Sequence, residues 1–200
     1  MRGRAASSLM AVAVCLAGAA CVSNKSVHHY TLGVAAAPAN VGRPDGLILL
    51  VGSIATPEAL QDGRIRFRAG SNEAGAYEYH RWTERPGSMV HDALIRALRE
   101  SGKYQRVLES GSSVSGDYLL HGKLDEFEEV DQASIQTRIA LHVELADRKT
   151  NRNVWDRTLE REEPVNGKRM VDVVQSFERN LHQVVSDTAD AVDAFLAARH

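Results

Sequence analysis

The chain has 200 residues, of which 44% are hydrophobic and 25% charged, a composition typical of one medium-sized globular domain. Its 24 basic residues nearly balance its 26 acidic residues, and the formal net charge is -2. Because nucleic-acid-binding domains carry a basic excess or a basic stripe, this balance predicts that nucleic acid is not a partner.

Residues 1–20 predict a secretory signal peptide. Arg2 and Arg4 give the segment a positive start, and Leu9–Ala20 is an apolar stretch that ends in small residues. The order of charged, apolar and small residues is that of a cleaved secretory signal. A transmembrane helix needs about 20 apolar residues, so this stretch is too short to span a bilayer.

Both cysteines of the chain, Cys15 and Cys21, lie in or directly after this segment. The rest of the chain can therefore hold neither a CxxC redox site nor a cysteine-ligated metal. Gly18–Cys21 resembles a bacterial lipobox, in which small residues precede a cysteine that receives acyl chains such as palmitate and becomes the mature N-terminus. We expect Cys21 to be the lipid anchor, since two or more buried acyl chains hold a protein stably on a membrane. The alternative is an ordinary signal peptide cut near Ala20, which leaves Cys21 without a role.

Val22 bears on which membrane carries the anchor. In enteric bacteria an aspartate at this position retains lipoproteins in the inner membrane, so valine favours the periplasmic face of the outer membrane over the inner membrane. Residues 21–46 are then predicted to be the lipidated N-terminus and a tether, with two prolines and four alanines in residues 34–45. If flexible, the 25 residues from 22 to 46 would span roughly 25–30 Å on average. His28 and His29 lie in this tether, where we expect no scaffold to hold them.

Residues 47–200 are predicted to form a single domain. The continuous apolar run Leu47–Ile54 indicates a strand buried on both faces, and residues 64–68 and 76–82 alternate like strands with one solvated face. Pro86 opens a helix whose apolar residues repeat at helical spacing until Gly102. A short strand is expected at residues 104–108, followed by a turn.

The clearest β pattern in the chain begins at Asp117. Alternation over residues 118–124 is broken in phase at Phe127, which predicts a bulge. Residues 135–145 and 154–162 then complete an antiparallel meander with one solvated face. A helix over 169–198 would run about 45 Å and pack its apolar stripe on the sheet. The fold class is thus α/β (α+β), a single domain with a mixed sheet, a C-terminal antiparallel meander, one central helix and one long C-terminal helix.

The sequence predicts no catalytic, cofactor-binding or metal-binding residue, and so no enzyme. None of the eight histidines has a second ligand at metal-binding spacing, and His142 is expected to face solvent. Four carboxylates near the end of a predicted strand are interpreted as a solvated sheet edge rather than an acid–base pair. They are Asp125, Glu126, Glu128 and Glu129.

Several landmarks, taken in order, resemble those of a known family. They are the lipobox at Cys21, Tyr30–Gly33, the strand Leu47–Ile54, Arg64–Arg68, Tyr77–Trp82 before Pro86, Gly116–Phe127 and the long C-terminal helix. Their order and spacing are similar to those of the ABC-type transport auxiliary lipoproteins, the PqiC/YmbA-like group. The resemblance covers nearly the whole mature chain, although Gly18 in the lipobox and Trp82–Pro86 depart from the family pattern.

This resemblance implies a lipid-anchored periplasmic domain that assists an MCE-domain protein in an ABC-type intermembrane lipid or solvent transport system, without catalysing a reaction. A homo-oligomer is a further arrangement that the sequence leaves open. The alternative function is a stand-alone lipid-binding or envelope-assembly lipoprotein. A periplasmic hydrolase with a dispersed site is a third hypothesis, for which the sequence offers no motif.

Overall fold

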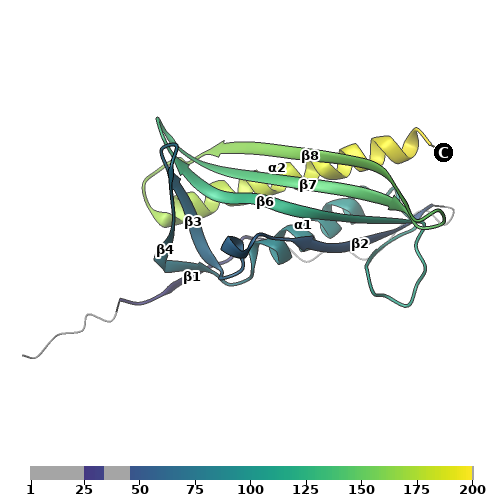
Figure 1. Ribbon diagram of the computed structural model, residues 1–200, viewed down its shortest axis with the longest axis horizontal. Coiled ribbons are helices and arrows are strands. Elements are labelled where there is room, and N and C mark those ends of the chain that lie inside the picture. The colour runs from purple at the N-terminus through teal and green to yellow at the C-terminus, as the bar shows by residue number, and fades with distance from the viewer. Residues whose placement is uncertain (1–24, 34–45, 200) are drawn as a thin grey trace, which may run out of the picture.

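The computed structural model describes residues 25–33 and 46–199 (Figure 1). The predicted signal peptide and Cys21 lie outside these residues. The described elements are, in chain order, β1 (His28–Tyr30), β2 (Ile48–Ala55), a 3₁₀ turn (Glu58–Leu60), β3 (Arg64–Ala69), β4 (Glu73–Trp82), α1 (Pro86–Glu100), β5 (Arg106–Glu109), β6 (Tyr118–Asp131), β7 (Ile135–Asp147), β8 (Arg152–Pro164) and α2 (Met170–Ala197).

The long strand β6 is the centre of an eight-stranded sheet within the described residues. Along one edge it pairs antiparallel with β7, which in turn pairs with β8. Along its other edge, β6 pairs in parallel first with β2 and then, beyond a bulge, with β3. The sheet therefore divides into two branches, β2–β5 and β3–β4–β1. This mixed sheet with two helices confirms the predicted fold class.

The predicted bulge lies where the register of β6 on β7 shifts, between Leu124 and Glu126. Asp125 is the extra residue of the bulge. Without the bulge, strict alternation from Leu124 would turn Phe127 to the opposite face, whereas with it Phe127 faces the core. Leu124 and Phe127 are consequently both buried, on the same side of the sheet as Leu141 and Ile139 of β7. A phase break in the sequence thus marks a bend in a continuous strand.

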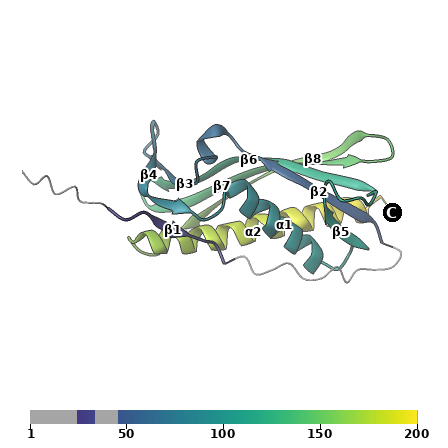
Figure 2. The ribbon, with the colours of Figure 1, turned by 90° about the horizontal axis from the view of Figure 1, so that it is seen from below.

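Both helices lie against one face of the sheet and leave the opposite face uncovered (Figure 2). Pro86 opens α1, where its fixed φ suits the first turn and its missing N–H costs no hydrogen bond. α2 has 28 residues and runs about 42 Å along β7 and β8. No helix among the described residues combines the length and the apolar character needed to cross a membrane.

An aromatic cluster joins the helices to the sheet. The ring of Phe177 on α2 stacks on Phe127 of β6, with 4.7 Å between centroids, and meets the edge of Trp82 of β4 at 5.3 Å. All three side chains are buried, and burial of each contributes about 1.5–3 kcal/mol. The β3–β4 branch and the meander are therefore packed on the same segment of α2.

The first described strand differs from expectation. His28–Tyr30 pair in parallel with His80–Trp82 of β4, so the prediction that His28 and His29 have no scaffold is wrong. The ring of His28 stacks on that of His80, with centroids 5.5 Å apart. Leu32 follows and is 4% exposed, packed in the core. Part of the segment that the sequence assigns to the tether is thus folded onto the domain.

Candidate docking face

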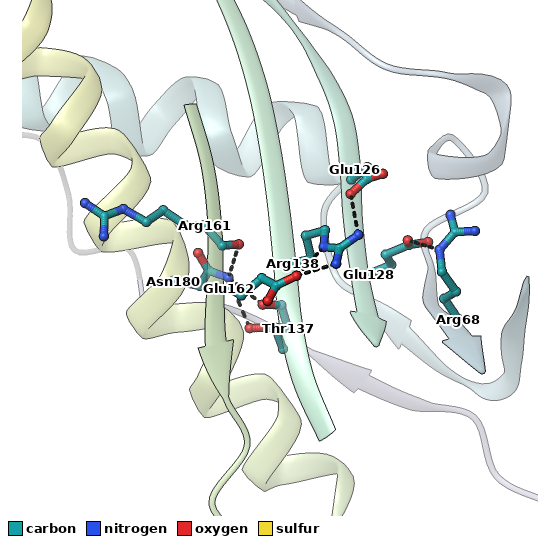
Figure 3. Close-up of polar contacts among 8 residues, drawn as sticks. All are labelled: Arg68, Glu126, Glu128, Thr137, Arg138, Arg161, Glu162 and Asn180. Atoms are coloured by element: carbon teal, nitrogen blue, oxygen red, sulfur yellow. Dashed lines mark hydrogen bonds and ion pairs between the residues drawn. The ribbon is translucent and has the colours of Figure 1, made fainter. Parts of the chain in front are cut away.

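A buried polar network fixes the sheet to α2 and so determines which face stays open. Asn180 of α2 is 1% exposed, and its Nδ2 donates to the carbonyl oxygens of Thr137 at 2.8 Å and Arg161 at 3.2 Å (Figure 3). Ser176, one helical turn earlier, bonds the Thr137 hydroxyl at 2.9 Å and donates to the Glu163 carbonyl oxygen at 2.9 Å. These bonds reach β7 and β8 at once, and hold the long helix in register with both strands.

The face of the meander opposite the helices is strongly polar, and we call it the open face. Antiparallel register and strand alternation place the following side chains on it: Glu126 and Glu128 of β6, Arg138, His142 and Glu144 of β7, and Asp156, Thr158, Glu160 and Glu162 of β8. The predicted solvent exposure of His142 is confirmed by its position on this face. Such a surface cannot bury itself against an apolar layer without losing hydration of its charges.

Charged side chains form a ladder across the open face. Arg138 lies between Glu162 of β8 and Glu126 of β6, with Nε 2.7 Å from Glu162 Oε1 and Nη1 3.7 Å from Glu126 Oε2 (Figure 3). On the next branch, Arg68 of β3 donates from Nε to Glu128 Oε1 at 2.6 Å. The hydrogen bond to Glu162 and the neighbouring carboxylates raise the pKa of Arg138 above its ordinary value. Arg138 therefore keeps its positive charge at every physiological pH.

The acidic cluster of β6 is split between the two faces of the sheet. At Glu128 and Glu129, β6 pairs with β3 on one side and with β7 on the other, so the prediction that the cluster lines a sheet edge is wrong for these two carboxylates. Glu126 and Glu128 point to the open face. Glu129 points to the helix side, where it is 4% exposed and accepts hydrogen bonds of 3.1 Å from the Tyr77 hydroxyl at both carboxylate oxygens. Burial raises the pKa of Glu129 above its ordinary value.

A second polar group lies farther along the open face. The Glu144 carboxylate lies 3.1 Å from His121 Nε2 and 3.3 Å from His142 Nε2. The other ring nitrogen of His142, Nδ1, lies 3.0 Å from the Thr158 hydroxyl. Within the described ranges no group of three or more histidine, cysteine or acidic side chains has the arrangement needed to hold a metal ion. This part of the open face presents charged and hydrogen-bonding groups to solvent.

The predicted anchor, Cys21, lies outside the described residues, so the structure does not bring it together with any other residue. The sequence predicted that one face of the meander is solvated, but it did not point to the ladder of charges on that face or to Asn180. A usable signal was present for Asn180, because this polar residue interrupts the apolar stripe between Phe177 and Leu181. A polar residue at a core-facing position of a helix normally has a buried partner.

Comparison with solved structures shows the same fold in other bacterial proteins. Protein XCC0632 from Xanthomonas campestris superposes with a TM-score of 0.75 and 22% identity, over 87% of this chain and 100% of its own. The hypothetical protein CT253 from Chlamydia trachomatis gives a TM-score of 0.54 and 8% identity, over 76% of this chain and 99% of its own. No curated protein matches the chain in a sequence comparison.

The family comparison covers most of the domain. The model of the ABC-type transport auxiliary lipoprotein component matches residues 30–189, from the end of β1 into the last turns of α2. The match begins at Tyr30, within the short strand that joins the N-terminal segment to β4. This chain belongs to the family of ABC-type transport auxiliary lipoprotein components.

Proposed function

We propose that this chain is a membrane-anchored periplasmic lipoprotein that serves an MCE/ABC-type intermembrane lipid or solvent transport system as a non-catalytic auxiliary subunit. Cys21 carries the acyl chains, and the periplasmic face of the outer membrane is the expected location. The family match over residues 30–189 is the observation that carries this proposal. The mechanism is positional, since the lipid holds the domain at the membrane and the domain binds its partner.

The open face is the surface we assign to the MCE-domain partner. Arg138 is already shared between Glu126 and Glu162. Asp156 and Glu160 of β8 are exposed and make no ion pair within the described part of the chain. This side of the ladder therefore carries an excess of negative charge, which favours a partner surface rich in lysine and arginine. The rigid sheet beneath it supplies a fixed pattern of charges.

The test is affinity purification of the full-length, lipidated protein from detergent-solubilised membranes, with co-eluting proteins identified by mass spectrometry. We expect an MCE-domain protein in the eluate. The double variant Asp156→Lys and Glu160→Lys should lose it, because charge reversal on a binding surface opposes association. Glu84→Lys, one charge reversal of the same kind at an exposed loop residue, is the control and should retain it.

Two outcomes would contradict the proposal at different levels. Recovery of the lipoprotein alone, even after chemical cross-linking, would reject the auxiliary role in an MCE system. Recovery of the MCE-domain protein with the double variant as well as with the wild type would keep that role and reject the open face as the docking surface.

A further inference from the structure

A groove lies between the two helices on the side away from the sheet, and the docking role leaves it unexplained. It has a volume of about 390 Å³, within the range of about 300–1,000 Å³ typical of small-molecule sites. Residues of α1 and α2 line it, together with Leu32 and Gly33 of the N-terminal segment. The apolar lining comprises Leu32, Ala93, Ala97, Leu181, Val185 and Ala189.

Small side chains create this space. Ala93 and Ala97 face the groove from α1, and Ala189 faces it from α2. Leu32, Leu181 and Val185 are each less than 5% exposed, so the floor is part of the core. An alanine at these positions leaves room where a longer side chain would fill the gap between two packed helices. The groove is consequently built into the packing of the helices.

Arg96 supplies the one buried polar feature that calls for a ligand. Its side chain lines the groove, and its Nε and Nη2 atoms are buried with no hydrogen-bond partner among the described residues. Arg99, one turn along the same helix, provides a contrast, because its Nε and Nη2 both donate to the Val107 carbonyl oxygen at 3.2 and 3.1 Å. Buried guanidinium N–H groups are normally paired, usually with an anion.

The other charged groups of the groove lie at its rim. Glu100, Glu178, His182 and Asp190 line it, and all four are exposed, so water screens their charges. The apolar floor therefore lies beside a guanidinium group that has two N–H donors without a partner among the described residues. A peptide backbone laid on this floor would bury its own N–H and C=O groups against alanine and valine, whereas an alkyl chain has no such groups.

We propose that this groove binds a single-chain anionic amphiphile. Its carboxylate or phosphate oxygens accept hydrogen bonds from Nε and Nη2 of Arg96 once that side chain has rotated into the groove, and its alkyl chain lies on the alanine and valine side chains of the floor. A fatty acid and a lysophospholipid share this chemistry. The inference is independent of the docking role, since the groove lies on the helix side of the sheet and the open face on the other.

Isothermal titration calorimetry of the chain from residue 21 to 200 tests this proposal, with Cys21→Ser removing the protein's own acyl chains. Dodecanoate and dodecyl phosphate, below their critical micelle concentrations, should bind at one site. Arg96→Gln should weaken both by about tenfold or more, as expected for a lost charge-assisted pair. Arg152→Gln, an exposed arginine at the start of β8, is the matched control and should leave the affinity unchanged.

A second variant separates the ligand site from an effect on folding. Ala97→Phe retains Arg96 and fills the groove, so it should abolish binding of both amphiphiles while circular dichroism stays that of the wild type. Dodecyltrimethylammonium, with the same chain and a positive head, should show no binding that depends on Arg96. Inorganic phosphate alone should bind far more weakly than dodecyl phosphate, because it lacks the apolar chain.

Three results would overturn the proposal. Equal affinity for the cationic and anionic amphiphiles would indicate adsorption to apolar surface, and equal affinity for inorganic phosphate would indicate an anion site without a chain site. Absence of binding, with α1 and α2 already protected from hydrogen exchange along the groove in the ligand-free chain, would assign the groove to a segment of the protein itself. In contrast, binding of dodecyl phosphate but not of dodecanoate would support the proposal and would show that the site prefers a phosphate head group.

Discussion

The Tyr30 hydroxyl lies 2.9 Å from Nδ1 of His80, and this contact joins two residues 50 positions apart in the chain. It fastens β1, the first described strand, to β4 in the body of the domain. The His28 ring stacks on the His80 ring, and the rings of Tyr77 and His80 meet edge to face with their centroids 5.7 Å apart. The imidazole rings of His28 and His80 and the phenol rings of Tyr30 and Tyr77 therefore form one cluster around His80.

This contact should make the attachment of β1 sensitive to pH. Burial, and secondly the neighbouring His28, lower the pKa of His80 below its ordinary value of 6.5. Above pH 6.5 His80 is neutral whether β1 is docked or free, and docking has its full stability. As the pH falls through 6.5 toward the lowered pKa, the free state takes up the proton first, so docking weakens.

Hydrogen exchange of the β1 amides between about pH 8 and pH 5 measures this effect, after correction for the intrinsic exchange rate. Protection should fall on the acidic side. His80→Gln should flatten the dependence, whereas His182→Gln, an exposed residue of α2, should preserve it. Protection that stays constant in the wild type would contradict the prediction.

Loss of Asn180 should destabilise the whole domain. Asn180→Ala removes the donor that satisfies the carbonyl oxygens of Thr137 and Arg161, so we expect the free energy of unfolding to fall by about 2 kcal/mol. Urea denaturation followed by circular dichroism measures the change. Gln183→Ala, an exposed change one turn away, should cost less than about 0.5 kcal/mol. Equal effects of the two variants would show that the buried network does not stabilise the helix on the sheet.

The Arg138 ladder should matter far less to stability. Arg138 is 25% exposed and Glu162 is 41% exposed, so solvent screens their attraction. Arg138→Gln should lower the free energy of unfolding by about 1 kcal/mol or less, and added salt should shrink the loss. The same denaturation experiment at low and high salt measures it. A salt-independent loss larger than that of Asn180→Ala would mean that the ladder supports the fold, and would contradict its assignment to partner recognition.

Cys21→Ser should release the protein from membranes without unfolding it, because the predicted anchor precedes the first described strand in the sequence. Membrane fractionation and a thermal melt of the soluble fraction measure the two effects. Cys15→Ser is the matched control, since Cys15 belongs to the predicted signal peptide, and it should leave the protein in the membrane fraction. A variant at Cys21 that stays in the membranes would reject lipidation at this residue.

The strands and helices with strong periodicity could be predicted from the sequence, whereas contacts across the sheet could not. Alternation from Ile135 to Leu145 identified β7 and the solvent-facing position of His142. The phase break before Phe127 identified the bulge. Both features depend on residues close in sequence, where the alternation of side chains between the two faces of a strand is reliable.

The failures share one physical origin, which is long-range pairing. Three residues at His28–Tyr30 are too few to show a period, and their pairing with β4 depends on contacts 52 residues away in sequence, since 80 minus 28 is 52. The acidic cluster of β6 has the charge pattern of a sheet edge, and only the pairing of β3 with Glu128 and Glu129 shows that these two residues lie inside the sheet. The groove beside Arg96 likewise requires two helices and the N-terminal segment to meet, and no local pattern predicts that meeting.

Attachment of β1 to β4 also limits how far the domain can stand from its membrane. With Cys21 as the lipid-bearing N-terminus, only residues 22–27 separate the acyl chains from His28. Whatever their conformation, six residues extend at most about 20 Å. β1 lies at the end of the domain opposite the C-terminus of α2 (Figure 1). The protein would therefore be confined to a thin layer along the bilayer, where its effective concentration for a partner in the same layer is high.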